Sequence, residues 1–172
     1  AEAEIKKCAL VCRYYAEHGE TFLRPETVTE QPELRRILYQ PLGVILAIMP
    51  WNYPYWQVFR FLAPALMAGN GAVLKHAENV TGCALEIAKL VEEAGFPQSL
   101  FQTLVCEVEV LEKVIENPLI QGVTLTGSER AGRTVAAQAG GALKKCVLEL
   151  GGSDAAVILD DADLKRAAAI CA

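Results

Sequence analysis

Apolar and polar residues follow a regular order along the chain from Leu42 onward. Short apolar runs rich in β-branched residues alternate with longer segments whose apolar positions recur every three or four residues. The first pattern is typical of strands buried on both faces, and the second of amphipathic helices. The predicted strands are Gly43–Met49, Gly71–Lys75, Leu100–Val105, Ile120–Leu125, Lys145–Leu150 and Ala155–Leu159, and the predicted helices are Trp56–Ala68, Thr81–Ala94, Val108–Glu116, Arg130–Ala139 and Asp163–Ala172. This alternation predicts an α/β fold: a mostly parallel sheet with helices on both faces.

The chain before this region has a different pattern. Residues 1–18 carry an apolar stripe at helical spacing, and we expect Gly19 to end that helix as a residue after the C-cap. Cys8 and Cys12 lie on the stripe, which favours core positions over metal ligands. In the polar, proline-containing connector that follows, Leu34–Gln40 is predicted to be an exposed edge strand that pairs elsewhere.

Composition narrows the function classes. The chain has 172 residues, of which 52% are hydrophobic and 22% charged, and its net charge is −5. This composition excludes intrinsic disorder, and an acidic balance argues against a nucleic-acid or anionic-membrane partner. No apolar run approaches the roughly 20 residues that a membrane helix needs. We therefore expect a cytoplasmic protein of about one domain.

Polar residues stand where predicted strands end and helices begin. Right-handed crossovers place all these turns at one edge of a parallel sheet, where such folds bind ligands. Asn52 lies between two prolines and could donate to a developing oxyanion, or it could simply stabilise a turn. Lys75 and Glu78 follow another strand, either as ligand-binding groups or as a solvated pair.

Two further positions carry candidate chemistry. Gly127 and Ser128 separate a strand from a helix, so they could hold a phosphate, or Ser128 could be a plain N-cap. A full G-x-G-x-x-G fingerprint is absent from the chain. Glu149 interrupts an apolar strand, and a buried carboxylate is costly unless it is paired, which favours a functional role.

Four motifs occur together, in the order Pro50–Pro54, Lys75–Glu78, Thr126–Ser128 and Leu148–Gly152. Their residues, order and spacing resemble the aldehyde dehydrogenase superfamily, and the resemblance runs essentially from end to end. The flanking segments Gln40–Met49 and Ala142–Asp154 are most similar to the succinate-semialdehyde dehydrogenase branch.

The resemblance implies roles for residues around the reacting carbon. Asn52 matches the amide donor that stabilises the oxyanion, and Glu149 matches the acid that activates water to hydrolyse a thioester. Arg60 matches an arginine that binds the distal carboxylate of the substrate, with Trp56 as a second substrate-binding residue. We expect Glu149 to be buried and to face the same crevice as Asn52.

The resemblance also implies a nicotinamide cofactor and no metal. Lys75 and Glu78 match a pair that contacts the adenosine ribose, where an acid would repel a 2′-phosphate and favour NAD over NADP. Gly127 and Ser128 match the pyrophosphate contact. The remaining expected cofactor-binding residues are Ile48, Pro50, Trp51 and Leu150. His76 stands where the family usually has proline, which indicates a structural residue in a turn.

The family's nucleophilic cysteine lies in a Gly-Gln-x-Cys motif, and no such motif occurs here. Cys171 lies in a helical alanine run and is predicted to be a core residue. We therefore expect an inactive fragment: an N-terminal helix and connector (1–26), an oligomerisation arm (27–40) and a dinucleotide-binding domain (41–172), with the catalytic-cysteine domain absent. The full-length protein would be a homo-oligomer that oxidises succinate semialdehyde. The alternatives are another aldehyde substrate, or a truncated, non-catalytic nucleotide-binding or interaction module.

Overall fold

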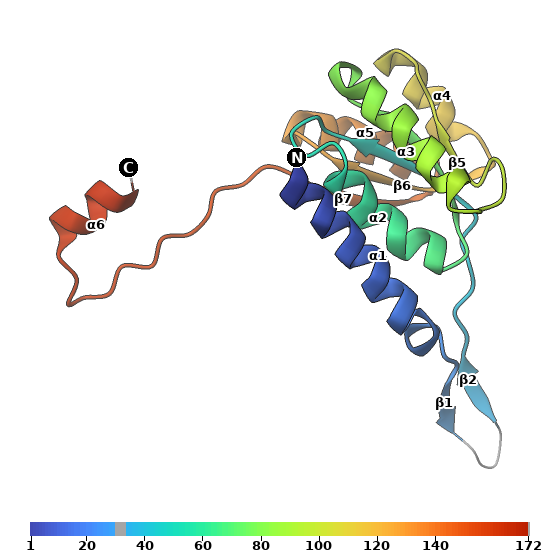
Figure 1. The fold of residues 1–172 in the computed structure, drawn as a ribbon, viewed down its shortest axis with the longest axis horizontal. Coiled ribbons are helices and arrows are strands. Elements are labelled where there is room, and N and C mark those ends of the chain that lie inside the picture. Colours follow the sequence, from blue (N-terminus) through green and yellow to red (C-terminus); the bar gives the residue numbers. More distant parts are fainter. Residues whose placement is uncertain (30–33, 172) are drawn as a thin grey trace.

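A five-stranded parallel sheet forms the centre of the molecule, as the computed structural model shows for residues 1–29 and 34–171 (Figure 1). The strand order is β5-β4-β3-β6-β7, and a separate two-stranded sheet is formed by β1 and β2. Every pairing within the large sheet is parallel. The predicted α/β fold class is confirmed.

Between residues 43 and 150 the elements follow the predicted order, with small shifts at their ends. The large sheet and its helices comprise β3 (Val44–Met49), α2 (Trp56–Met67), β4 (Gly71–His76), α3 (Thr81–Glu93), β5 (Phe101–Thr103), α4 (Leu111–Glu116), β6 (Ile120–Thr126), α5 (Glu129–Gly141) and β7 (Lys145–Glu149). The elements outside it are α1 (Glu2–Phe22), β1 (Glu26–Thr29), β2 (Arg35–Ile37) and α6 (Leu164–Cys171), and single 3-10 turns cover Glu78–Val80 and Val108–Val110.

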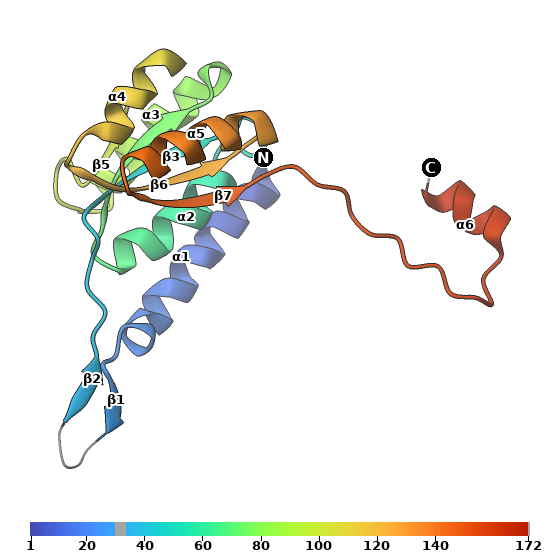
Figure 2. The same ribbon diagram turned by 180° about the vertical axis from the view of Figure 1, so that it is seen from behind.

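Helices cover both faces of the sheet because its strands are apolar on both sides. Ala47 of β3 and Leu74 of β4 belong to a core cluster with residues of α2 and α3. Leu46 and Leu125 belong to a second cluster with residues of α4 and α5. Successive strand residues point to opposite faces, so the central strands β3 and β4 contribute to both clusters. The helix α1 packs against α2 on the outside of the first layer (Figure 2).

The carboxyl ends of four strands meet at one edge of the sheet. Met49 at the end of β3 pairs in register with His76 of β4, and Thr126 at the end of β6 pairs with Glu149 of β7. The turns that follow these strands carry the motifs singled out above. The predicted gathering of these turns at a single edge is therefore confirmed.

Gly19 does not end the first helix, contrary to expectation. The helix α1 continues to Phe22, and Gly19 is buried within it. A Cβ atom built on Gly19 would lie 2.5 Å from Cγ of Met67 in α2. The glycine therefore allows close helix–helix packing instead of supplying a left-handed cap.

The connector after α1 contains a hairpin that its polar pattern did not predict. Glu26–Thr29 pairs antiparallel with Arg35–Ile37, so the edge strand expected within Leu34–Gln40 is shorter and has a partner within the chain. The hairpin projects from the body of the molecule (Figure 1). The part of the expected oligomerisation arm at residues 30–33, like Ala172, lies outside the described residues.

The strand expected at Ala155–Leu159 is absent from the described structure. This segment is extended but unpaired, and Val157 is 84% exposed. A strand needs a neighbour to bond, and none of the described strands pairs with this segment. Beyond it, α6 lies away from the sheet with no buried residue, so the expected core position of Cys171 is wrong for this chain (Figure 1). No helix among the described residues is long and apolar enough to cross a membrane.

Candidate functional site

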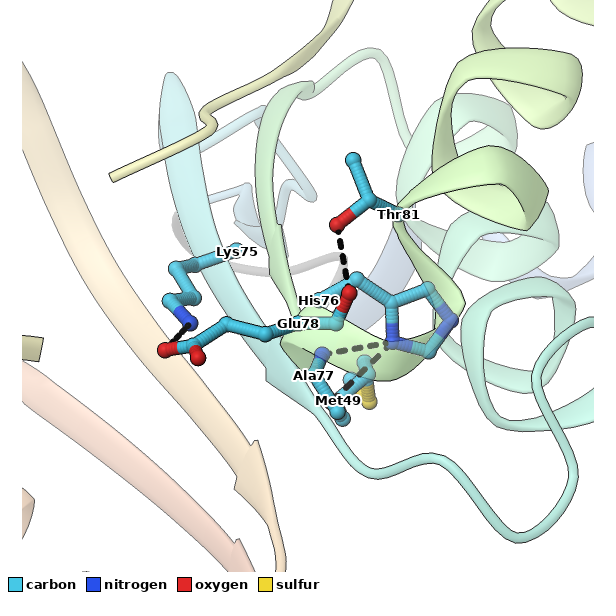
Figure 3. Close-up of polar contacts among 6 residues, drawn as sticks. All are labelled: Met49, Lys75, His76, Ala77, Glu78 and Thr81. Carbon is cyan, nitrogen blue, oxygen red and sulfur yellow. Dashed lines mark hydrogen bonds and ion pairs between the residues drawn. The ribbon is translucent and has the colours of Figure 1, made fainter. Parts of the chain in front are cut away.

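The turn that carries Asn52 joins β3 to α2 and is held by a buried histidine. The Nε2 atom of His76 lies 2.9 Å from the carbonyl oxygen of Pro54, and its Nδ1 atom lies 3.1 Å from that of Met49. The backbone N–H of Ala77 donates to Nδ1 at 3.1 Å (Figure 3) and also to the Met49 carbonyl at 3.0 Å, so Nε2 is the nitrogen that carries the proton and donates to Pro54. His76 thus holds the Pro54 end of the Asn52 turn, and the Ala77 N–H holds the Met49 end. It is a structural residue, as the sequence indicated.

The start of α2 is capped from α1 by Glu4. Its Oε1 atom accepts hydrogen bonds from the backbone N–H groups of Tyr55 at 2.9 Å and Trp56 at 3.0 Å. A carboxylate at a helix N-terminus also interacts favourably with the positive end of the helix dipole. The ammonium of Lys7 lies 3.9 Å from the ring centroid of Trp56. The indole of Trp56, an expected substrate-binding residue, therefore packs against α1.

A groove of about 440 Å³ lies between α2 and the strands β6 and β7. Alternate residues of the two strands point into it, among them Thr124, Thr126, Val147 and Glu149. These side chains share the face that carries α2, but α2 does not reach across β7. Val147 is consequently 60% exposed. The groove is an open, partly apolar channel with charged residues at the carboxyl ends of the strands.

Arg60 and Glu149 meet in this groove. The Nη1 atom of Arg60 lies 3.5 Å from Oε2 of Glu149, and Nη2 donates to Oγ1 of Thr126 at 3.3 Å. Glu149 is not a buried strand-interior residue as expected: it is the last residue of β7, and its side chain is 56% exposed. The edge strand ends there, so the carboxylate extends from the sheet beside α2. The carboxylate is paired with a cation that the sequence did not indicate as its partner.

The predicted cofactor pair lies at the ends of β4 and the following turn. The ammonium of Lys75 is 3.8 Å from the Glu78 carboxylate, and the two side chains are 7% and 71% exposed respectively (Figure 3). The backbone carbonyl of Glu78 also accepts a hydrogen bond from the Thr81 hydroxyl at 2.9 Å. Both charged residues line a small hollow, together with Thr103 at the end of β5 and Cys106 in the loop that follows. The pair therefore presents one buried cation and one accessible acid at the ligand edge.

The third strand end carries Gly127 and Ser128. The backbone N–H of Gly127 donates to the carbonyl of Glu149 at 3.0 Å, which joins this turn to the end of β7. The Ser128 hydroxyl accepts from the Ala131 N–H at 3.3 Å and caps α5. Ser128 is thus an N-cap, and its role toward a phosphate stays a prediction. Leu150 packs on the first turn of α5, where a Cβ on Gly132 would lie 2.5 Å from it.

The remaining predicted residues lie along the same edge. Ile48 is half-buried against the α4–α5 cluster, whereas Trp51 is 62% exposed beside Asn52. The structure brings Arg60, Glu149 and Thr126 together, and it brings Lys75 and Glu78 together at a separate hollow.

Sequence reasoning missed the contributions of Glu4 and Gln57. Glu4 accepts hydrogen bonds from Tyr55 and Trp56, which lie more than 50 positions later in the chain, and no local sequence pattern indicates such a contact. Gln57 lines the groove, and its buried Oε1 atom has no hydrogen-bond partner among the residues that the structure describes.

Cys8, which is buried, and Cys12 and Cys146, which are half-buried, are not poised as nucleophiles. Burial raises the pKa of the Cys8 thiol to about 11, and it also raises the pKa of Cys12 and Cys146. A thiol becomes reactive through its thiolate, which these surroundings disfavour. Among the described residues, no group of three or more His, Cys, Asp or Glu side chains could hold a metal ion.

Comparison with known proteins places these features in context. The model of the aldehyde dehydrogenase family matches residues 1–172. A probable succinate-semialdehyde dehydrogenase [NADP(+)] of Synechocystis sp. is 57% identical over 97% of this chain, and the succinate semialdehyde dehydrogenase [NAD(P)+] Sad of Escherichia coli is 51% identical over 97%.

A solved structure gives the same result for the fold. The succinic semialdehyde dehydrogenase of Streptococcus pyogenes in complex with NADP+ superposes with a TM-score of 0.89 at 41% identity, over 95% of this chain. The chain spans only 37% and 36% of the two curated relatives and 36% of that solved chain. Because the family model matches every residue, the chain belongs to the aldehyde dehydrogenase family.

Proposed function

We propose that this chain forms the cofactor-binding segment of a longer enzyme that oxidises succinate semialdehyde to the acid with a nicotinamide dinucleotide. The observation that carries the proposal is the shared groove of Arg60 and Glu149. A guanidinium binds a carboxylate with a matching fork of donors, and the acid beside it can accept a proton from water. The names of the matched relatives support this choice of aldehyde.

Asn52 and Glu149 would act at successive stages. A cysteine thiolate supplied by the rest of the enzyme would add to the aldehyde carbon, and the Asn52 amide would stabilise the negative oxygen that forms. After hydride departure, Glu149 would remove a proton from the water that attacks the thioester. Asn52 is exposed in a turn fixed by His76, and Glu149 is accessible at the end of β7, which suits both roles.

The residues at the β4 end fit a dinucleotide. The Lys75 ammonium and the exposed Glu78 carboxylate can respectively donate to and accept from ribose hydroxyls. The N-terminus of the thirteen-residue helix α5 offers backbone N–H groups to a phosphate. When bound, the nicotinamide ring accepts the hydride. Gly127, Ser128, Ile48, Pro50, Trp51 and Leu150 complete the proposed cofactor-binding set.

Steady-state kinetics of the full-length protein test the proposed function. We expect it to reduce the cofactor with succinate semialdehyde and to show a higher KM for butanal, which has the same chain length without the carboxylate. The reason is the charge-assisted fork of Arg60, since hydrogen bonds to ionised groups are about twice as strong as neutral ones. The absorbance of the reduced nicotinamide measures both reactions. Equal KM values for the two aldehydes would contradict the assigned substrate class, and absence of turnover with any aldehyde would contradict the activity.

The preference between NAD and NADP rests on Glu78. Its carboxylate is 71% exposed, so a 2′-phosphate placed on the adenosine ribose would meet a negative charge. The names of the matched relatives give NADP(+) or NAD(P)+, and they do not support the preference for NAD that the sequence alone indicated. We keep NAD as the proposed cofactor on the strength of this carboxylate.

Glu78→Gln keeps the size of the side chain and removes its charge. We expect kcat/KM for NADP relative to NAD to rise about fivefold, the equivalent of about 1 kcal/mol of relieved repulsion at an exposed site. Glu93→Gln is the matched control, because Glu93 lies at the opposite end of α3 and pairs with Lys89 at 3.6 Å. An unchanged cofactor ratio in Glu78→Gln would show that this acid does not select the cofactor.

The exposed hairpin of β1 and β2 supports a proposed domain division and a proposed assembly. The hairpin of β1 and β2 projects from the body and exposes Val28, Ile37 and Leu38 by 59%, 46% and 62%. Such a strand pair suits an arm (27–40) that another subunit covers. The arm would separate the N-terminal helix and connector (1–26) from the cofactor-binding part (41–172) of a cytoplasmic homo-oligomer.

A further inference from the structure

The groove holds a three-residue contact that a substrate clamp alone does not require. The two terminal nitrogens of Arg60 have different partners: Nη1 lies 3.5 Å from Glu149 Oε2, and Nη2 donates to Thr126 Oγ1 at 3.3 Å. Thr126 and Glu149 are register partners on β6 and β7. The guanidinium therefore spans two neighbouring strand ends from the helix α2.

We propose that Arg60 is a positioning residue for Glu149, with Thr126 as the anchor that fixes the guanidinium. The inference rests on the proposed function, because it gives Arg60 a role in thioester hydrolysis as well as in substrate binding. Glu149 is the last residue of an edge strand and its side chain is 56% exposed, so its backbone alone leaves the carboxylate several rotamers. Pairing one of its oxygens with Arg60 selects among them.

The donor count allows both roles at once. A guanidinium has five N–H donors, and the contacts to Thr126 and Glu149 involve only the two terminal nitrogens. The remaining donors can bind a substrate carboxylate that enters the groove. On the other side, Oε2 of Glu149 faces Arg60, which leaves Oε1 to accept a proton from water. Arg60 can thus hold the substrate and the base in one arrangement.

The two roles separate when the aldehyde lacks a carboxylate. With butanal, a residue that only clamps the substrate has nothing to bind, so its removal leaves turnover unchanged. A residue that positions Glu149 is still needed, because the thioester of butanal must also be hydrolysed. We therefore expect Arg60→Ala to lower kcat for butanal by about tenfold, since a displaced reacting group loses rate.

Stopped-flow kinetics of the full-length enzyme locate the affected step. Cofactor reduction precedes hydrolysis, so the first turnover appears as a burst of reduced nicotinamide. Arg60→Ala should keep the burst rate with butanal and lower only the steady-state rate that follows. Arg60→Lys, which keeps the charge but cannot span both partners, should fall between the wild type and Arg60→Ala. Thr126→Val should show a smaller loss of the steady-state rate in the same direction.

Matched variants and outcomes decide the inference. Thr134→Val is the control for Thr126→Val, because Thr134 is exposed on α5, outside the groove, where its hydroxyl donates to the Arg130 carbonyl at 3.2 Å. It should leave the steady-state rate with butanal unchanged. If Arg60→Ala alters only the KM for succinate semialdehyde and leaves butanal turnover intact, Arg60 is a substrate clamp alone and the inference is overturned. That result leaves the proposed function standing, whereas a wild-type enzyme without aldehyde oxidation overturns both.

Discussion

Glu149→Gln in the full-length enzyme is expected to leave the first turnover intact and to stall the turnovers that follow. The carboxylate would act on the water that hydrolyses the thioester, a step after the hydride has left, so the burst of reduced nicotinamide should persist. The steady-state rate should fall by about 10²–10⁴-fold, the usual contribution of a positioned general base. Stopped-flow absorbance over the first turnover and the following seconds measures both phases.

The groove explains why this substitution isolates a single step. Glutamine keeps the shape of the side chain, and its carbonyl oxygen can still accept a hydrogen bond from Arg60, whose Nη1 lies 3.5 Å from the native carboxylate. Glu116→Gln makes the same chemical change at the end of α4, at the opposite edge of the sheet, and should alter neither phase. A Glu149→Gln enzyme with normal steady-state turnover would remove Glu149 from the hydrolysis step.

The large sheet was predictable from sequence because its central strands β3 and β4 are buried on both faces. Runs such as Val44–Met49 and Gly71–His76 consist mostly of apolar residues, and each is separated from the next by a segment with helical periodicity. Parallel order and right-handed crossovers follow from that alternation. The gathering of Lys75, Gly127 and Glu149 at one edge is a consequence of topology and required no knowledge of contacts.

The outlying segments were less predictable because distant residues decide their structure. Gly19 has the composition of a helix end, but the approach of Met67 makes it an interior residue of α1. Ala155–Leu159 has the composition of a strand, but no strand in the described part of the chain lies beside it to bond it. In both cases the local sequence indicated the conformational propensity correctly, but it carried no information about the distant segment whose presence or absence determines the structure.

The candidate site also has a part that the sequence predicts and a part that it does not. Its residue types could be named from the sequence, because an arginine and an acid at strand and helix positions near one edge indicate chemistry. Their mutual contact could not, since it depends on the register of β6 with β7 and on where α2 crosses them. The prediction that Glu149 is buried was wrong because Glu149 is the last residue of an edge strand, which has a neighbouring strand on one side only.

Asn52→Ala is expected to slow the steps before hydride transfer, which Glu149→Gln leaves intact. Its amide would donate to the oxygen that becomes negative when the thiolate adds, and losing one such donor costs about 10²–10³-fold in rate. The burst of reduced nicotinamide should therefore slow as well as the steady state. Asn52→Asp should be at least as slow, because it keeps the shape while replacing a donor by a negative charge.

Thermal unfolding separates this chemical role from a structural one. Asn52 is exposed in a turn whose ends are held by His76 and by the Ala77 N–H, so Asn52→Ala should leave the unfolding temperature unchanged. Asn70→Ala is the informative contrast: Asn70 is buried, and its Oδ1 accepts from the backbone N–H groups of Leu42 at 2.7 Å and Gly43 at 3.2 Å. It should lower the unfolding temperature because two donors lose their partner. If Asn52→Ala instead lowers the unfolding temperature and keeps a normal burst, the asparagine shapes the turn and another group must stabilise the oxyanion.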